Sequence, residues 1–384
     1  MNLNKLIPLY IGAAVGPLGG FGVVTIIPVF AGVWSIDFAA ASLAITFYMV
    51  PFIAIQIFSG PIAYLFDVRK TLLMGFAVYT LGGIVAAVSG SFPMLLAGRI
   101  VQGIGGAFLA PIIMAMVGEL VPPAHLGKAM GGLGLAYTAG VTLGPAISGM
   151  LEVRYGWQGF FYFLSALTAL TAVLFMIWCR DIRPKTDGRQ SLLNIFPLIR
   201  RAFFYPGVPF LSFAAFSLFV AYIGIMTFTA DYLKTVFSLT SDKIGYMLSL
   251  TGVSGLVMSP IAGILGDRFG RHKVFAGGMI VMLAAIGLML ALPFEYGLFM
   301  ILFLLLGAGS ATGWTSLNTM AVQASPELRT PVTSAYNTIK FSGYAFSPVI
   351  LSIFYGGSRL TAVQWACIGA IIISLILALR TRRI

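Results

Sequence analysis

The sequence predicts an all-α membrane protein with twelve transmembrane helices, arranged as two pseudo-symmetric six-helix halves with both termini in the cytoplasm. Of its 384 residues, 59% are apolar and only 9% are charged, whereas soluble domains carry about 25% charged residues. Twelve long apolar stretches follow one another along the chain, and the second half repeats motifs of the first. These observations exclude an ordinary soluble enzyme.

Each of the twelve apolar stretches is long enough to cross a bilayer as a helix, which takes about 20 residues. Ten contain no charged residue, and the fourth and the eleventh contain one each. In order, the predicted segments are residues 6–33, 38–63, 71–92, 94–118, 129–151, 157–179, 207–230, 244–266, 274–294, 297–322, 332–357 and 360–379. We expect the first to be a spanning helix, because its apolar part is too long for a cleavable signal peptide.

The distribution of Lys and Arg predicts the orientation of the chain in the membrane. With the N-terminus inside, seventeen of these residues lie on the cytoplasmic side and four on the other side. Cytoplasmic loops of membrane proteins carry this excess of positive charge. The net charge of +12 is therefore interpreted as a topology signal with attraction to anionic membrane lipid, and no nucleic-acid partner is expected.

A hydrophilic stretch divides the predicted segments into six and six. It runs from Arg180 to Tyr205 and carries six of the cytoplasmic basic residues. We therefore expect an N-terminal half at residues 1–179, a cytoplasmic linker at 180–205 and a C-terminal half at 206–384.

An internal repeat relates the two halves. The string GIGGAFLAPIIMAMVGELVPPAH from Gly103 lies over GAGSATGWTSLNTMAVQASPELR from Gly307 at a constant offset of 204 residues. Earlier in each half, SGPIAYLFDVRK from Ser59 echoes SPIAGILGDRFGRHK from Ser259. Repeats of this kind place a binding site near the bilayer midplane between the halves and allow one half to rock against the other.

The loop after the eighth segment reads GILGDRFGRH, and it resembles the signature loop of the major facilitator superfamily. Gly263 and Gly270 are expected to permit close helix approach and a tight turn. Asp267 beside Arg268 and Arg271 can form a charge network at a helix end. We predict that this network is a latch that holds one conformation and breaks in the other. The resemblance covers essentially the whole chain.

The equivalent loop of the first half departs from this pattern. Tyr64 and Leu65 stand where the family has its Asp and Arg, and Asp67 stands where it has the second Gly. Asp67 is the candidate to supply the missing carboxylate one turn later. The two latches are therefore expected to differ in strength.

The fourth segment contains LLAGRIVQGIGGA, which resembles the superfamily's motif of an Arg followed by a Gln-Gly pair. A charge inside the membrane is costly, so Arg99 should face the bundle interior and have a partner. The resemblance links this Arg to proton coupling. The repeat places Phe303 at its counterpart, so the charge belongs to one half only.

The fifth segment carries GVTLGPAISGM, which is similar to the GPxxGG motif of the superfamily's exporters, with Ser148 in place of one glycine. Gly144, Pro145 and Gly149 should produce a kinked, closely packed helix. The resemblance implies export rather than uptake. Together with the other motifs, it favours the drug–proton antiporter branch.

Lys340 lies near the middle of the eleventh segment, where an ammonium group is expected to be functional. Tyr336, Asn337, Lys340 and Tyr344 are spaced three and four residues apart, which puts them on one face of a helix. We expect this polar face to handle substrate or protons. The other predicted contact residues are large or polar groups in helices of small residues, namely Tyr137, Trp314 and Asn318.

The eleven carboxylates are all expected at helix ends or in loops. Arg99 and Lys340 would then be the only embedded charges, and their positive potential favours an anionic or zwitterionic substrate. The candidates for carrying a coupled proton are Glu119 and Asp231, which are expected at cavity mouths, or Lys340 itself.

The sequence therefore predicts a secondary transporter in the plasma membrane of a prokaryote, a monomer that exports a small organic anion or zwitterion in exchange for protons by alternating access. The alternative is a multidrug efflux antiporter for lipophilic or cationic compounds. An enzyme is not expected, because no cluster of His, Cys, Asp or Glu lies at membrane depth. An ATP-driven pump would need a phosphate-binding loop. No cofactor or metal is expected, because the chain has only two Cys and two His.

Overall fold

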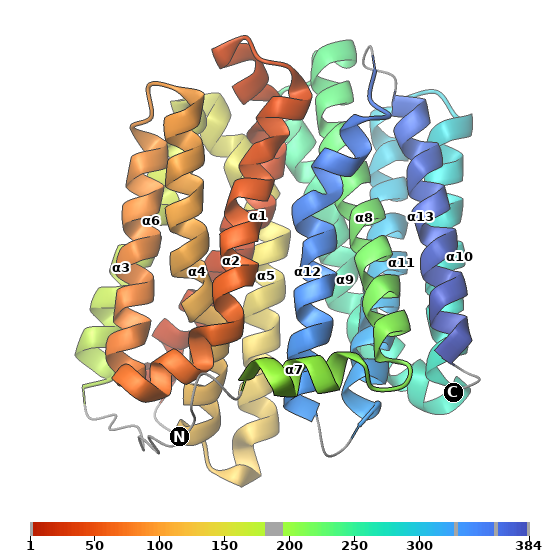
Figure 1. Ribbon diagram of the computed structural model, residues 1–384. Coiled ribbons are helices and arrows are strands. Elements are labelled where there is room, and N and C mark those ends of the chain that lie inside the picture. Colours follow the sequence, from red (N-terminus) through yellow and green to blue (C-terminus); the bar gives the residue numbers. More distant parts are fainter. Residues whose placement is uncertain (1–2, 181–194, 326–328, 357–359, 382–384) are drawn as a thin grey trace. The chain divides into compact units, whose positions relative to one another are not determined.

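The computed structural model describes residues 3–180, 195–325, 329–356 and 360–381, and over these ranges the chain is helical with no strand (Figure 1). It divides into two compact units. The first comprises Met1–Leu192 with Thr240–Gly245, and the second comprises Leu193–Leu239 with Tyr246–Ile384. Each unit is described separately below.

The first unit contains six long helices. They are α1 (Leu3–Trp34), α2 (Phe38–Phe66), α3 (Val68–Ala87), α4 (Phe92–Leu120), α5 (Pro123–Tyr155) and α6 (Trp157–Trp178). Short connections separate them, and Asp37 begins α2 by accepting a hydrogen bond from the amide of Ala40 at 2.6 Å. Such caps satisfy the free amides at a helix N-terminus and fix where the helix starts.

The second unit contains a short helix and six long ones. They are α7 (Ile195–Phe203), α8 (Val208–Phe237), α9 (Ser241–Phe269), α10 (Arg271–Ala291), α11 (Tyr296–Gln323), α12 (Arg329–Ser352) and α13 (Leu360–Arg380). The helix α7 lies in the stretch predicted as a linker, where no helix was expected. The twelve predicted segments fall on the other twelve helices, so the expected all-α fold is confirmed.

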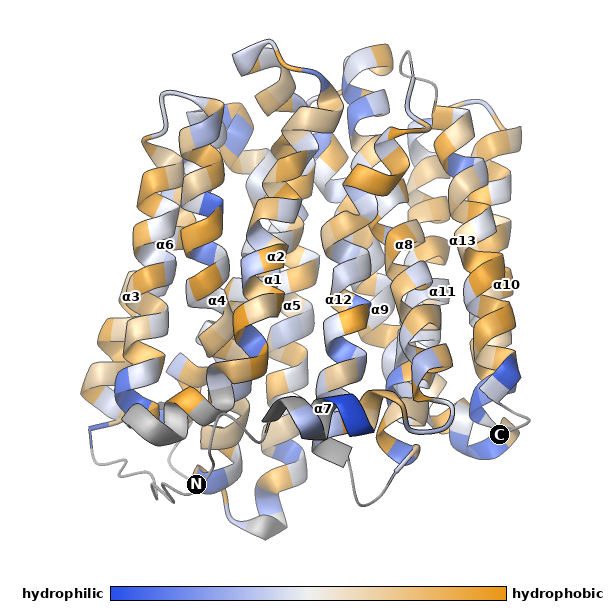
Figure 2. Cartoon of the chain, viewed as in Figure 1, coloured by the Kyte–Doolittle hydropathy of each residue, from blue (hydrophilic) through white to orange (hydrophobic). Residues whose placement is uncertain are grey.

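Ten of the helices are long and apolar enough to cross a membrane. Figure 2 shows apolar residues along these helices and hydrophilic ones gathered towards their ends. Neither α5, with 33 residues, nor α12, with 24, reaches that apolarity. Their sequences are rich in Gly, Ser and Thr. Small residues let helices pack closely inside a membrane bundle. Helices associate there through van der Waals packing, because the lipid tails are as apolar as the side chains.

The internal repeat of the sequence is also seen in the structure, because equivalent helices of the two units pack closely in the same way. A Cβ placed on Gly105 of α4 would lie 2.8 Å from the carbonyl oxygen of Gly75 on α3. A Cβ on Gly309 of α11 would lie 2.7 Å from the carbonyl oxygen of Gly278 on α10. Contacts this short exclude any larger side chain. The same two helices therefore meet through the same pair of glycines in each unit.

Apolar side chains also cover much of the surface of each unit. Met114 on α4 is 58% exposed and Leu135 on α5 is 62% exposed. Large exposed apolar areas mark an interaction surface in a protein. In a chain of spanning helices this surface faces lipid tails. The few polar groups then lie between the packed helices of each unit.

Candidate functional site

Arg99 is fully buried within the first unit, at 0% exposure. Its Nε donates to the carbonyl oxygen of Ala44 on α2 at 3.1 Å, and its Nη1 donates to Oε1 of Gln102 at 2.9 Å. The guanidinium carbon lies 4.2 Å from the ring centroid of Tyr48. Planar guanidinium groups suit such a combination of hydrogen bonds and stacking. As predicted, Arg99 faces the interior of its unit.

Two tyrosines connect this arginine's surroundings to α1. The hydroxyl of Tyr48 donates to the carbonyl oxygen of Gly16 at 3.2 Å, and that of Tyr79 donates to Val15 at 3.3 Å. Sequence reasoning missed Gln102 and Tyr48 as partners of the arginine. The spacing of three residues between Arg99 and Gln102 could have identified Gln102. Tyr48 lies in none of the motifs, so no sequence signal pointed to it.

Lys340 is 7% exposed on α12 of the second unit, where aromatic rings surround it. Its Nζ lies 4.6 Å from the ring centroid of Phe341, 5.2 Å from that of Tyr336 and 5.9 Å from that of Phe219. A weak hydrogen bond of 3.5 Å joins Nζ to Oδ1 of Asn318 on α11. At that length a hydrogen bond contributes little.

The rings around Lys340 continue into a larger aromatic cluster. The ring of Trp314 lies 6.0 Å from that of Phe219 and 5.5 Å from that of Tyr222, edge to face in the second case. The hydroxyls of Tyr222 and Thr251 are 2.9 Å apart and share a hydrogen bond. Edge-to-face geometry suits aromatic pairs because the positive ring edge meets the negative face. This cluster joins α8, α9, α11 and α12.

The lysine has no carboxylate partner in the part of the chain that the structure describes, where the ion pair found joins Asp267 to Arg271. An ammonium group has three hydrogen-bond donors. The acceptor that the structure gives for them is Oδ1 of Asn318, at the long distance of 3.5 Å. The hydroxyl of Tyr336, which is 1% exposed, is also without a hydrogen-bond partner among the described residues. The site therefore has an excess of donors.

The remaining predicted contact residues differ in exposure. Tyr344 is 3% exposed, and Asn337, seven residues earlier on α12, is half-buried. Tyr137 on α5 is 36% exposed. Of the predicted contact residues, Asn318 and Tyr336 lie next to Lys340, and Trp314 belongs to the aromatic cluster that adjoins it. The contact roles of all these residues stay predictions.

Among the residues that the structure describes, three carboxylates are seen to cap helices. They accept hydrogen bonds from backbone amides at the N-termini of α2, α3 and α11, and they are Asp37, Asp67 and Glu295. This use of a side chain is typical of helix starts. Glu119, one of the two proton candidates, is exposed next to the last residue of α4.

Asp231 is not at a helix end, so the prediction that every carboxylate lies at an end or in a loop is wrong for this residue. It is 3% exposed inside α8, which continues to Phe237. The hydroxyl of Tyr355 donates to its Oδ2 at 2.7 Å. This charge-assisted hydrogen bond compensates the buried carboxylate, which allows the helix to continue past it.

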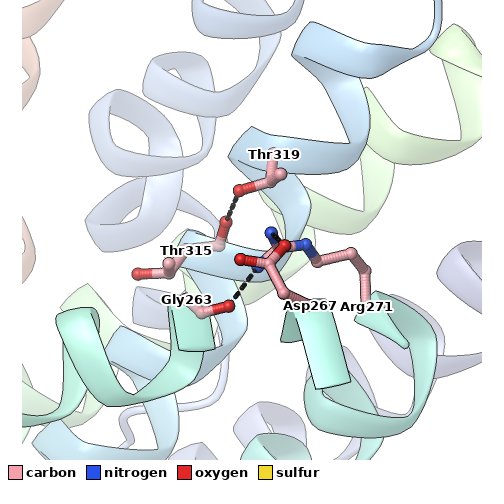
Figure 3. Close-up of polar contacts among 5 residues, drawn as sticks. All are labelled: Gly263, Asp267, Arg271, Thr315 and Thr319. Atoms are coloured by element: carbon pink, nitrogen blue, oxygen red, sulfur yellow. Dashed lines mark hydrogen bonds and ion pairs between the residues drawn. The ribbon is translucent and has the colours of Figure 1, made fainter. Parts of the chain in front are cut away.

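The predicted latch of the second half contains an ion pair (Figure 3). Asp267 and Arg271 point towards each other, and Nη1 of Arg271 also donates to the carbonyl oxygen of Gly263 at 2.8 Å. On α11, shown in the same view, Thr319 donates to the carbonyl oxygen of Thr315 at 2.8 Å. The ion pair therefore ties the end of α9 to the first residue of α10.

Of the two glycines singled out in this loop, one has the expected role and the other does not. A Cβ on Gly263 would meet none of the described residues within 4 Å, so the structure shows no close approach at this glycine. A Cβ on Gly266 would instead lie 2.7 Å from Cδ of Arg271, so it is Gly266 that makes room for the arginine. Gly270 has φ of +92° in the turn before α10, as expected for a tight turn that favours glycine.

The other basic residues of the loop lie outside the ion pair. Arg268 is exposed, and its guanidinium carbon lies 5.3 Å from the ring centroid of Phe269. Nε2 of His272 and Oγ1 of Thr381 are 2.9 Å apart, which ties the start of α10 to the residue after α13. Arg268 is thus placed beside the latch rather than in it.

In the first half, Asp67 occupies the same turn as Gly270 does in the second, with φ of +87°. Its Oδ1 accepts hydrogen bonds from the amides of Arg69 at 2.9 Å and Lys70 at 3.0 Å. In this structure its carboxylate is therefore a helix cap. The guanidinium of Arg69 donates to the carbonyl oxygen of Met176 at 3.4 Å, so α3 is tied to the end of α6.

The exporter-like motif lies where α5 packs against α1. A Cβ on Gly144 would lie 2.8 Å from the carbonyl oxygen of Leu18. Thr25 on α1 donates to the carbonyl oxygen of Pro145 at 3.3 Å. Gly149 is buried one turn later. A proline in a helix interrupts the backbone hydrogen bonds. Here the hydroxyl of Thr25 on the neighbouring helix donates a hydrogen bond to the backbone at the proline.

Comparisons with known proteins identify the family. The sequence model of the Major Facilitator Superfamily matches residues 9–242 and 211–383. One relative is the uncharacterised MFS-type transporter YhcA of Bacillus subtilis, which is 26% identical over 56% of this chain and 50% of its own length. Another is a homologue of the multidrug resistance efflux pump PmrA from Lactococcus lactis, which is 27% identical over 68% of this chain and 63% of its own length.

Solved structures agree with the fold. The nucleoside transporter NupG has a TM-score of 0.79 at 13% identity and covers 99% of both chains. A POT family transporter bound to 5-aminolevulinic acid has a TM-score of 0.76 at 14% identity, covering 98% of this chain and 96% of its own. The chain spans less than two thirds of the curated relatives named above. It is a multi-pass integral protein of the bacterial plasma membrane, and it belongs to the Major Facilitator Superfamily of transporters.

Proposed function

We propose that this transporter exports a small organic anion or zwitterion, and that Lys340 binds the negative group of the substrate. The observation that carries this proposal is the shortage of acceptors around the buried ammonium, whose hydrogen bond to Asn318 is 3.5 Å long. A bound carboxylate or similar group would supply both hydrogen-bond acceptors and the missing countercharge. It would thereby offset part of the cost of a cation in an apolar environment.

The aromatic rings around the lysine suggest the rest of the ligand. Phe219, Trp314 and Phe341 form an apolar wall at the distances given above. Binding sites for small molecules combine such apolar walls with a few polar groups that orient the ligand. We therefore infer a substrate with an apolar or planar body and one anionic group.

A lipophilic cation would meet repulsion at the same place. Two unit charges 6 Å apart repel each other by about 3 kcal/mol at an effective dielectric constant of about 20. That energy corresponds to a loss of affinity of roughly 100-fold. The charge on Lys340 therefore supports an anion or zwitterion over a cation of equal size.

The second candidate function is multidrug efflux of lipophilic or cationic compounds. Two relatives carry such names, the PmrA homologue of Lactococcus lactis and the multidrug resistance protein Stp of Mycobacterium tuberculosis, which is 24% identical over 72% of this chain and 61% of its own length. The aromatic cluster around Trp314 is compatible with bulky apolar drugs. This candidate requires Lys340 to remain distant from the drug.

Proton coupling is part of the proposal, and Asp231 is its preferred carrier. Its carboxylate is 3% exposed and accepts a hydrogen bond from Tyr355, which follows the last turn of the helix that carries Lys340. Protonation would remove a buried charge and change that hydrogen bond. Glu119 is exposed, so its protonation would change the energy of the protein much less.

Ligand-induced thermal stabilisation of the detergent-purified protein tests the substrate class. A ligand that binds only the folded state stabilises it by about 2.7 kcal/mol at 100 times its dissociation constant. Organic anions should raise the apparent melting temperature, and their neutral amides or esters should not. The anion effect should disappear in Lys340→Gln and persist in Lys243→Gln, in which an exposed lysine is replaced.

The opposite result would favour multidrug efflux. If lipophilic cations stabilise the protein and anions of similar size do not, the positive site is not a substrate site. Proton coupling has a separate readout in proteoliposomes, where substrate should drive proton movement. Asp231→Asn should abolish this movement, and Glu119→Gln should leave it intact. The reverse pattern would assign the proton to Glu119.

A further inference from the structure

The short helix α7 is amphipathic in sequence. In the string IFPLIRRAF, from 195 to 203, the basic side is formed by Arg200 and Arg201, with Pro197 between them on the same side. At 100° per residue these three positions fall within one arc of about 100°. All three are exposed in the structure. A helix with a compact basic side and an otherwise apolar sequence is typical of the membrane–water interface.

Packing holds α7 against the second unit at one end of its spanning helices. Ala202 is fully buried against Val208, the first residue of α8, and Val332 in the first turn of α12. Figure 1 shows α7 running crosswise to the long helices of this unit. Because spanning helices begin here, α7 lies at the level where apolar segments end and lipid headgroups begin.

An aromatic side chain next to the two arginines points to the same environment. Phe204 directly follows α7 and is 70% exposed. An exposed phenylalanine is unfavourable in water, whereas at a membrane surface it can enter the acyl region while arginine side chains reach the phosphates. Phe204, Arg200 and Arg201 therefore form a surface with the composition of an interfacial anchor.

The same end of the second unit carries further positive charge. A Cβ on Gly207 would lie 3.9 Å from Thr381, which in turn bonds to His272, so the ends of α7, α10 and α13 are neighbours. Lys273 and Arg380 are exposed beside these residues. This charge favours anionic over zwitterionic headgroups, and arginine is suited to phosphate because its donors form a planar fork.

We propose that Arg200, Arg201 and Phe204 form a binding site for the phosphate headgroup of anionic lipids. The packing of Ala202 with Val208 and Val332 holds α7 in place, so that these three side chains are presented at the end of the unit.

Native mass spectrometry of the full-length protein tests this site with phosphatidylglycerol and phosphatidylcholine as probes. The variant Arg200→Gln with Arg201→Gln should bind phosphatidylglycerol about 30-fold more weakly, since each basic residue near an anionic surface contributes roughly fivefold. The comparison variant is Lys273→Gln with Arg380→Gln, which removes the same charge from the same end of the unit and should weaken binding less than the α7 variant does. Phosphatidylcholine binding should be weak and equal in all proteins.

Further variants keep the test independent of folding and of the transported substrate. Arg200→Lys with Arg201→Lys keeps the charge and should restore most of the binding, and Phe204→Ser should weaken it. If the two glutamine variants lose the same amount of phosphatidylglycerol binding, the binding depends on the general surface charge and not on α7. That result would overturn the proposal. Unchanged binding in the α7 variant would also overturn it, as would displacement of the lipid by equimolar inorganic phosphate.

Discussion

The two embedded cations of this protein are held in opposite ways. Arg99 in the first unit donates to a backbone carbonyl and to Gln102, and it stacks on Tyr48 at 4.2 Å. Lys340 in the second unit has a single hydrogen bond of 3.5 Å to Asn318 and is otherwise surrounded by rings. Two hydrogen bonds and a stacked ring hold the arginine, whereas one long hydrogen bond holds the lysine.

This difference arises on a shared scaffold. The glycine pair Gly105 and Gly75 of the first unit recurs as Gly309 and Gly278 of the second. The repeat counterpart of Arg99 is Phe303, which is fully buried. Equal packing with unequal charge indicates that this contact between glycines does not depend on either cation. A polar group that is poorly satisfied in a folded protein is typically retained for function at a cost in stability.

Replacing Lys340 should produce the largest change. We expect Lys340→Met to abolish transport in proteoliposomes and yet to raise the stability of the fold by about 1–3 kcal/mol, because methionine fills a similar volume without a buried charge. Lys340→Arg should restore transport only in part, since a guanidinium is larger and stays charged. Transport at the wild-type rate in Lys340→Met would remove the lysine from the mechanism.

Replacing Arg99 should have the opposite effect on stability. Arg99→Met leaves the carbonyl of Ala44 and the amide of Gln102 without their donor, so we expect a loss of about 2–4 kcal/mol in unfolding free energy. Thermal unfolding in detergent, followed by intrinsic fluorescence, measures this loss. Gln102→Leu in the Arg99→Met background should recover part of it, because both side chains of the hydrogen bond between residues 99 and 102 are then apolar. A neutral effect of Arg99→Met would show that the two cations are held alike.

The loops of the two halves extend the comparison. Asp267 pairs with Arg271, whereas Asp67 caps α3. We expect Asp267→Asn to shift the balance between conformational states by about 1–3 kcal/mol, or roughly five- to hundredfold. Maleimide labelling of single cysteines placed at either end of the transport path measures this shift.

The native cysteines should be replaced in that experiment. Burial at the end of α6 raises the pKa of the Cys179 thiol to about 11. Because the thiolate is the reactive form, Cys179 itself should label slowly at neutral pH. Identical labelling of the Asp267→Asn variant and its parent at both ends would show that the ion pair does not act as a latch.

Substitutions of Asp67 should have the smallest effect. Its φ of +87° favours glycine, and its carboxylate caps α3. Asp67→Gly should be close to neutral, because relief of backbone strain offsets the loss of the cap. Asp67→Ala loses the cap and keeps the strain, so it should cost about 1–2 kcal/mol in unfolding free energy. If Asp67→Gly shifts the cysteine labelling as strongly as Asp267→Asn does, Asp67 serves the latch after all.

Most of the fold was predictable from the sequence, because segment length and hydropathy directly determine which residues cross a membrane. Each of the twelve predicted segments coincides with one helix over most of its length, although the segments 71–92, 274–294 and 332–357 run past the ends of α3, α10 and α12. The helix α7 was missed because its nine residues lie in a stretch defined only by its charge and its lack of a long apolar run. Its apolar residues recur at helical spacing, a signal that becomes visible when the linker is examined for periodicity.

The candidate site was predictable only in part. The cost of a charge in the membrane identified Arg99 and Lys340 as buried residues. Some of their partners come from other helices, such as Ala44 for Arg99 and Asn318 for Lys340, and α-helical periodicity relates residues on one helix only. Asp231 was placed at a helix end because the apolar run stops at residue 230, but the helix continues and Tyr355 meets the carboxylate.

The sequence by itself determined the spanning segments, the repeat and the identity of the embedded cations, since each follows from local composition or from the spacing of residues along one helix. Tertiary structure alone decided how each cation is held. The acceptors of Arg99 come from α2 and α4, and the rings around Lys340 come from α8 and α12. It likewise decided that Gly266 rather than Gly263 accommodates Arg271. Such contacts depend on the distance and rotation between helices, which side-chain packing sets.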